Sequence, residues 1–126
     1  GVANRQKSTQ DLEAFLRSSQ RSGQPLALAV LDVDRLRDVN AEYGHAAGDR
    51  VLRQFAHQLR QAFNGEDVVA RWGGEEFVIG MYGMTREDGV QRLIQVLEHI
   101  DHQAMQIETG ETLQVTIFPI YGTSTV

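Results

Sequence analysis

The chain has 126 residues, of which 41% are hydrophobic and 23% are charged, and these fractions are ordinary for a single globular domain. Its formal net charge of -5 provides no summed positive field, which argues against DNA or RNA as a partner. Cysteine is absent, which excludes disulfides and thiolate metal sites, and no apolar run approaches the roughly 20 residues that span a bilayer. We therefore expect a cytoplasmic domain without direct membrane contact.

The first stretch of the chain predicts a helix that begins at a capping residue. Ser8 or Thr9 can cap it, and the segment 18–25 ends it. Residues 26–33 then form a nearly unbroken apolar run of strand length, which predicts a central strand covered on both faces. A short helix that ends at Tyr43 follows this strand.

The middle of the chain predicts a long helix after a glycine-containing loop over residues 44–48. Apolar side chains recur in this helix at helical spacing. They are Val51, Leu52, Phe55, Leu59, Ala62 and Phe63. Segments 68–71 and 75–79 have strand composition, and the glycines between them predict a β-hairpin.

The last part of the chain predicts one more helix and a second hairpin. Thr85 with Asp88 resembles a capping box and marks the start of the helix. Residues 106–108 and 113–117 can pair around Thr109 and Gly110. The order of elements predicts an α/β or α+β domain, with a central mixed sheet flanked by helices and a βαββαβ kernel.

Acidic residues end two of the predicted strands. Asp32 lies at the carboxyl end of the central strand, where open α/β sheets place ligands, although acids at strand ends are often only solvated. Glu75 follows Gly73 and Gly74, and either a closely approaching ligand or a simple type I′ turn explains these glycines. If the two strands are neighbours, Asp32 and Glu75 can grip a divalent cation, and the carbonyl of Val33 can join them.

A polar cluster lies between these acids in the sequence. Asn40, His45 and Asp49 can act together on a nucleotide, because an amide and a carboxylate can read the edge of a guanine. Each residue also has a simpler explanation, since Asp49 suits the first turn of a helix and His45 a cap or the surface. Arg37 is either a solvated helix charge or a cation directed at a triphosphate.

Four stretches, taken together and in this order, resemble the diguanylate cyclase domain of the GGDEF family in its GGEEF variant. They are residues 1–5 (GVANR), 32–40 (DVDRLRDVN), 43–49 (YGHAAGD) and 71–77 (RWGGEEF). The resemblance implies a ferredoxin-like or polymerase-palm-like fold, GTP as the substrate and cyclic di-GMP as the product. Since one domain holds one GTP, it also implies a homodimer in which two domains face each other during catalysis.

The resemblance assigns a role to each motif residue. Mg²⁺, or Mn²⁺ in its place, would be held by Asp32, Glu75 and the backbone oxygen of Val33, and Glu75 would also be the base for the ribose 3′-hydroxyl. Asn40 and Asp49 would contact the guanine, and His45 would help to position the substrate. Gly73 and Gly74 would lie beneath the triphosphate and ribose. Arg37 would act at the transferring phosphate, where the family usually has a lysine.

Two departures from the family pattern limit what the resemblance implies. The family's RxxD feedback motif corresponds to residues 64–67, where Asn64 replaces the arginine, so product inhibition through that site is not expected. Residues 115–120 stand where a strand usually leads into a final helix. We expect residues 1–126 to be a single GGDEF domain, cut from a longer multidomain protein and lacking that helix. A weak or inactive domain that binds GTP or cyclic di-GMP as a signalling module, and a purely structural dimerisation domain, are the alternatives.

Overall fold

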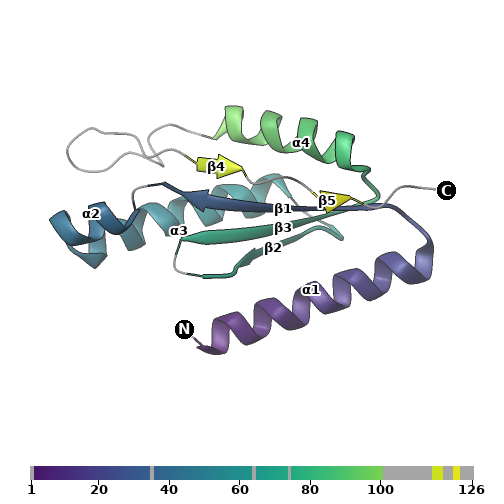
Figure 1. The fold of residues 1–126 in the computed structure, drawn as a ribbon, viewed down its shortest axis with the longest axis horizontal. Coiled ribbons are helices and arrows are strands. Elements are labelled where there is room, and N and C mark those ends of the chain that lie inside the picture. Colours follow the sequence, from purple (N-terminus) through teal and green to yellow (C-terminus); the bar gives the residue numbers. More distant parts are fainter. Residues whose placement is uncertain are drawn as a thin grey trace.

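A computed structural model describes residues 2–34, 36–63, 65–73, 75–100, 115–117 and 121–122 of the chain. The helices and strands alternate along the chain and form a sheet with helices packed against it (Figure 1). In chain order they are α1 (Val2–Ser22), β1 (Leu26–Val33), α2 (Leu36–Tyr43), α3 (His45–Ala62), β2 (Val68–Arg71), β3 (Glu76–Tyr82), α4 (Arg86–His99), β4 (Val115–Ile117) and β5 (Tyr121–Gly122). Within the described ranges, no helix combines the length and the apolar character that a bilayer crossing requires.

The sheet has the strand order β2-β3-β1-β4, and β5 also pairs with β1. This order confirms the predicted α+β class and the βαββαβ kernel. Every pairing among the described strands is antiparallel, whereas a mixed sheet was expected. The reason is the hairpin: it places β3 rather than β2 beside β1, and β3 runs in the opposite direction to both of its neighbours.

β1 is the central strand because its alternate side chains are apolar and fully covered. Ala27, Ala29 and Leu31 are each 0% exposed, and they belong to one core with side chains of α3, β3 and α4. The intervening residues of β1 are half-buried, so the other face is covered only in part. Phe15 of α1 packs on that other face, where its ring meets Gly80 of β3.

Helix α1 is longer than the sequence predicted at both ends. It begins at Val2, so Ser8 and Thr9 are interior residues and not caps. The residues before them include good helix formers, and no proline interrupts the segment. The helix ends at Ser22, and the next residue, Gly23, has a φ of 70° and donates its backbone N–H to the Ser19 carbonyl over 3.1 Å.

The predicted loop over residues 44–48 is wrong, because α3 begins at His45. A single residue, Gly44, separates α2 from α3, and its φ of 88° is one that glycine adopts without strain. Gly44 donates its N–H to the Asn40 carbonyl over 2.9 Å, which closes the end of α2. Ala46 and Ala47 then favour helix, and the predicted apolar face of α3 is confirmed from Val51 onward.

The predicted cap of α4 is confirmed, since the Thr85 hydroxyl accepts a hydrogen bond from the Asp88 N–H over 3.3 Å. The first half of the predicted second hairpin lies outside the described residues. The second half corresponds to β4. Among the described residues, β4 pairs with β1, which is far away in the sequence.

Candidate functional site at the acidic end of the sheet

The carboxyl end of β1 lies directly beside the tip of the β2–β3 hairpin. The backbone N–H of Val33 donates to the carbonyl of Glu75 over 3.0 Å, and Asp32 stands opposite Glu76 in the strand register. Asp32 and Glu75 are both half-buried. Two acidic segments that are far apart in the sequence are therefore joined by a backbone hydrogen bond.

The hairpin tip is wider than a two-residue turn. Arg71 pairs with Phe77, and the Trp72 N–H donates to the Glu76 carbonyl over 2.9 Å, so residues 73–75 form the loop. The type I′ alternative for the glycine pair is therefore wrong, because that turn has two central residues. The Arg71 side chain also donates from Nε to the Gly73 carbonyl over 3.4 Å, which links the strand to its own tip.

Phe77, which follows the two glutamates, ties the hairpin tip to α3. Its side chain is 0% exposed, and its ring meets Phe55 of α3 edge-on, with 5.4 Å between the centroids and 80° between the planes. Aromatic pairs favour this T-shaped arrangement. The tip therefore has a fixed position relative to the helix that carries His45 and Asp49.

The predicted guanine-contacting residues lie on the two helices that follow β1. Asn40 is on α2, and His45 and Asp49 are in the first turns of α3, where a spacing of four residues puts them on the same side of the helix. His45 and Asp49 are exposed. The Asn40 side-chain oxygen is shielded from solvent and has no hydrogen-bond partner among the residues that the structure describes. Figure 1 shows α2, the end of β1 and the hairpin tip at the same end of the sheet.

Two predicted site residues are described only in part or not at all. Arg37 lies on α2, but its side chain is outside the described part of the chain, as is Gly74. Gly73 is half-buried, and a Cβ added to it would meet only the Glu76 side chain, at 3.7 Å from Oε1. The local fold therefore leaves room for a side chain at Gly73.

The donor set at this end of the sheet consists of oxygen atoms. Within the described ranges there is no cluster of three or more His, Cys, Asp or Glu side chains that could hold a metal ion. Magnesium does not require such a cluster, because it is commonly held by one or two carboxylates while waters and substrate phosphates complete its octahedron. Asp32 and Glu75, as carboxylates on adjacent backbone segments, fit this kind of site.

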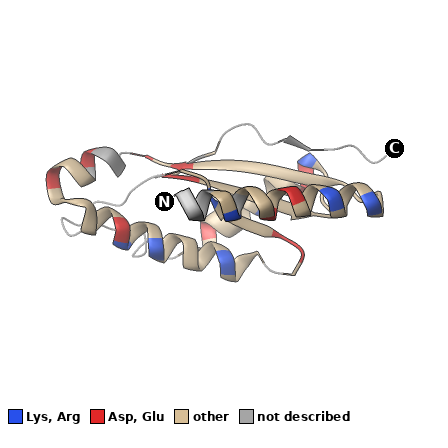
Figure 2. Ribbon diagram, turned by 90° about the horizontal axis from the view of Figure 1, so that it is seen from below, with Lys and Arg blue, Asp and Glu red and all other residues tan. Residues whose placement is uncertain are grey.

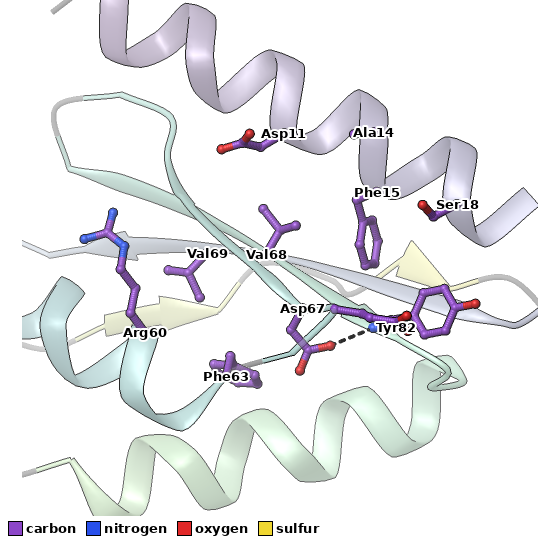
Figure 3. A pocket seen from close by; sticks show the side chains of 11 residues that line it. Asp11, Ala14, Phe15, Ser18, Arg60, Phe63, Asp67, Val68, Val69 and Tyr82 are labelled. Atoms are coloured by element: carbon purple, nitrogen blue, oxygen red, sulfur yellow. Dashed lines mark hydrogen bonds between the residues drawn. The ribbon is translucent and has the colours of Figure 1, made fainter.

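A pocket that sequence reasoning missed lies away from these residues (Figure 3). It has a volume of about 470 Å³ and is bounded by α1, the end of α3 and the start of β2. Its lining includes Phe15, Phe63 and Asp67, and Asp67 accepts a hydrogen bond from the Tyr82 N–H over 2.9 Å. Glu66 and Asp67 of its lining belong to residues 64–67, the stretch that corresponds to the family's feedback motif, whereas its other walls come from segments that meet only in the folded chain.

The fold and the acidic sheet end define a palm-like α+β domain. The family model "Diguanylate cyclase, GGDEF domain" matches residues 1–123, and the chain belongs to this family. The chain is 37% identical to the diguanylate cyclase DgcP of Pseudomonas aeruginosa over 116 residues, which are 92% of this chain and 17% of DgcP. It therefore spans less than a fifth of the length of that relative.

Two solved structures have the same fold. The GGDEF domain of DgcB from Caulobacter crescentus, in complex with c-di-GMP, has a TM-score of 0.80 and 23% identity, with coverage of 97% of this chain and 73% of that one. The active GGEEF domain of a diguanylate cyclase from Vibrio cholerae has a TM-score of 0.78 and 25% identity, with coverage of 96% and 76%. These two structures confirm the predicted fold, and the family model confirms the predicted family.

Proposed function

We propose that this chain is a diguanylate cyclase domain that condenses two GTP molecules into cyclic di-GMP. In each half-reaction the ribose 3′-oxygen of one GTP attacks the α-phosphorus of the other, the bond to pyrophosphate breaks, and the hydroxyl proton leaves to a base. The observation that carries the proposal is the hydrogen bond from Val33 to Glu75, because it joins the two acidic motifs at one end of the sheet. Membership of the family supports the same reaction.

The proposed metal ligands are Asp32, Glu75 and the backbone oxygen of Val33, with Mg²⁺ or Mn²⁺ as the ion. When bound, this ion would neutralise charge on the phosphate oxygens of the substrate. Both side chains are acidic, and their backbones are held next to each other by main-chain pairing. The two carboxylates would therefore offer a pair of hard oxygen donors, which is what such an ion prefers.

The chain's own residues would bind and orient the nucleotide. We assign the guanine to Asn40 and Asp49, since the shielded Asn40 oxygen has no partner among the described residues and a guanine amine can donate to it. His45 would help to position the substrate, and Arg37 would face the transferring phosphate.

At the hairpin tip, Gly73 and Gly74 would let the triphosphate and ribose lie against the backbone. The backbone of Gly73 is approached only by the flexible Glu76 side chain, at ordinary contact distance from an added Cβ, which supports this assignment. Glu75 would receive the proton of the 3′-hydroxyl. Positioning and electrostatics supply most of the catalysis in phosphoryl-type transfer, so a rigid tip next to fixed helices suits the reaction.

Catalysis would require two domains. One site binds one GTP, and the two nucleotides must react with each other twice to close the ring. We therefore propose a homodimer in which two acidic sheet ends face each other across a two-fold axis.

The direct test is an incubation of the protein with GTP and Mg²⁺, followed by chromatography of the nucleotides. Cyclic di-GMP should form, chelation of the metal should stop it, and Glu75→Gln should lower turnover by about a hundredfold or more, as expected for loss of a general base. Glu66→Gln is the control, since it removes an exposed carboxylate that lies away from the sheet end. A dimeric protein that binds GTP in a calorimeter but yields no product would overturn the proposed reaction and favour a binding module.

A further inference from the structure

A single glycine connects the two helices that carry the residues assigned to the guanine. Asn40 lies on α2, whereas His45 and Asp49 lie on α3, and Gly44 is the whole connection between these helices. Figure 1 and Figure 2 show α2 beyond the end of the sheet, with the start of α3 beside it. The backbone of Gly44 therefore sets the direction that α3 takes from the end of α2.

The backbone of Gly44 has a conformation that other residues avoid. Its φ is 88° and its ψ is 162°, a combination that almost only glycine adopts. Apart from its chain neighbours, no atom would lie within 4 Å of a Cβ added to Gly44. Packing therefore does not demand glycine at this position, whereas the direction of the chain does. Backbone conformations of this kind are concentrated at active sites and ligand clamps.

Helix α3 is anchored in the core, whereas the described side chains of α2 are not. Val51 and Phe55 of α3 are buried in the main core cluster. In α2 the structure describes the side chains at 38 and 40–43, and none of these is buried. Because Gly44 is the point at which α2 joins the anchored helix, its backbone governs where α2 lies.

We propose that Gly44 is a positioning residue that places Asn40 and Asp49 on the same guanine. This inference rests on the proposed function, because it assumes that both side chains contact the base. The Gly44 N–H donates to the Asn40 carbonyl over 2.9 Å, so the turn is bonded directly to one of the two residues. The shielded Asn40 side-chain oxygen has no partner among the described residues, and it reaches the guanine amine only when α2 has the correct angle to α3.

The test compares two nucleotides in a calorimeter, with the whole chain and Mg²⁺ present. They are 3′-deoxy-GTP and 3′-deoxyinosine triphosphate, which both lack the attacking hydroxyl, so that binding is measured without turnover. Inosine lacks the exocyclic amine of guanine, and the ratio of the two dissociation constants therefore reports the contact with Asn40. The unmodified chain should prefer the guanine nucleotide by about tenfold, as expected for one hydrogen bond in a shielded site.

Gly44→Ala should reduce this preference to about twofold or less, because alanine is strained at this φ and ψ and the turn relaxes by moving α2. A purely structural role for Gly44 would weaken the binding of both nucleotides by the same factor and leave their ratio unchanged. The ratio therefore separates positioning from a general loss of stability.

Gly83→Ala is the matched control. Gly83 also has a positive φ, of 75°, and an added Cβ there would likewise have nothing within 4 Å. It follows Tyr82, which pairs with Leu26 at the opposite end of β1 from Asp32. Both substitutions should lower the urea midpoint of unfolding, because alanine is disfavoured at positive φ. Only Gly44→Ala should lower the preference for the guanine nucleotide.

Asn40→Ala shows whether Gly44 acts through Asn40. If it does, Asn40→Ala should remove the preference, and the double variant with Gly44→Ala should change the ratio no further. Equal binding of the two nucleotides by the unmodified chain, an unchanged ratio in Gly44→Ala, or additive effects of the two substitutions would overturn the proposal. So would a Gly44→Ala chain that does not fold while Gly83→Ala does, because the glycine would then serve folding. Binding of neither nucleotide by the unmodified chain would overturn the proposed function itself.

Discussion

The hairpin tip and the packed layers between helices and sheet both contain glycines, but the surroundings of these glycines differ. A Cβ on Gly73, at the tip, would approach only a flexible side chain, at 3.7 Å. A Cβ on Gly89 of α4 would lie 2.7 Å from the Cβ of Ala27, and one on Gly80 of β3 would lie 2.9 Å from the ring of Phe15. Packing therefore demands glycine at positions 80 and 89, whereas nothing in the fold demands it at position 73.

This difference separates stability from activity. The packed layers keep α1 and α4 close to the sheet, and their residues should affect unfolding before they affect chemistry. The acidic sheet end consists of half-buried and exposed polar groups, and its residues should affect turnover without much effect on unfolding. Substitutions chosen from the two regions test whether this separation holds.

The largest effect should come from Gly89→Val. The added side chain would collide with Ala27 and with Met81, whose Cε lies 3.2 Å from the position of the new Cβ. Overpacking of this kind costs about 3 kcal/mol of unfolding free energy, with α4 forced away from β1. Urea unfolding followed by circular dichroism measures this loss. An unchanged midpoint would show that α4 moves freely, and the contrast with the tip would disappear.

Asp32→Asn should have the next largest effect, and on turnover rather than on stability. The substitution keeps the shape of the side chain but removes the charge that we propose for the metal site. Cyclic di-GMP formation should fall by about a hundredfold, equivalent to about 2.7 kcal/mol, while the unfolding midpoint changes little. Asp11→Asn on α1 is the control for removing one carboxylate. Full turnover by the Asp32 variant would place the metal elsewhere.

Gly73→Ala should have the smallest effect and gives the sharpest comparison with Gly89. Its backbone has no left-handed φ, and the fold leaves space for a methyl group, so the unfolding free energy should stay within about 0.5 kcal/mol. Turnover should fall by about tenfold if the triphosphate lies against this backbone, because a small displacement of the reacting atoms is costly. Steady-state kinetics at several GTP concentrations would show the change, and unchanged kinetics would mean that the ligand does not approach Gly73.

Local signals in the sequence predicted much of the fold. The apolar run of β1 and the cap at Thr85 were correct because each depends on neighbouring residues alone. The boundaries of α1 and α3 were wrong for related reasons. Ser8 and Thr9 resemble caps but lie inside a helix, and Gly44 turns the chain in one residue where a loop was expected. A single residue with positive φ is not visible as such in a sequence.

The candidate site was predictable only in outline. The sequence placed Asp32 and Glu75 at strand ends, but their adjacency depends on which strand pairs with β1 and in which register. The width of the hairpin tip follows from the same register, which is why the turn type was wrong. Gly80 and Gly89 gave no signal at all, because the atoms that forbid a side chain there belong to Phe15 and Ala27, far away in the chain.

The position of β1 in the sheet has a consequence for how the chain matures. One edge of β1 pairs with β3, and the other pairs with β4 and β5, which lie more than 80 residues after β1 along the chain. Until those residues emerge from the ribosome, the second edge keeps unpaired backbone groups that can recruit another nascent chain. Pairing of this edge therefore waits for β4 and β5, as is typical of topologies dominated by distant pairings.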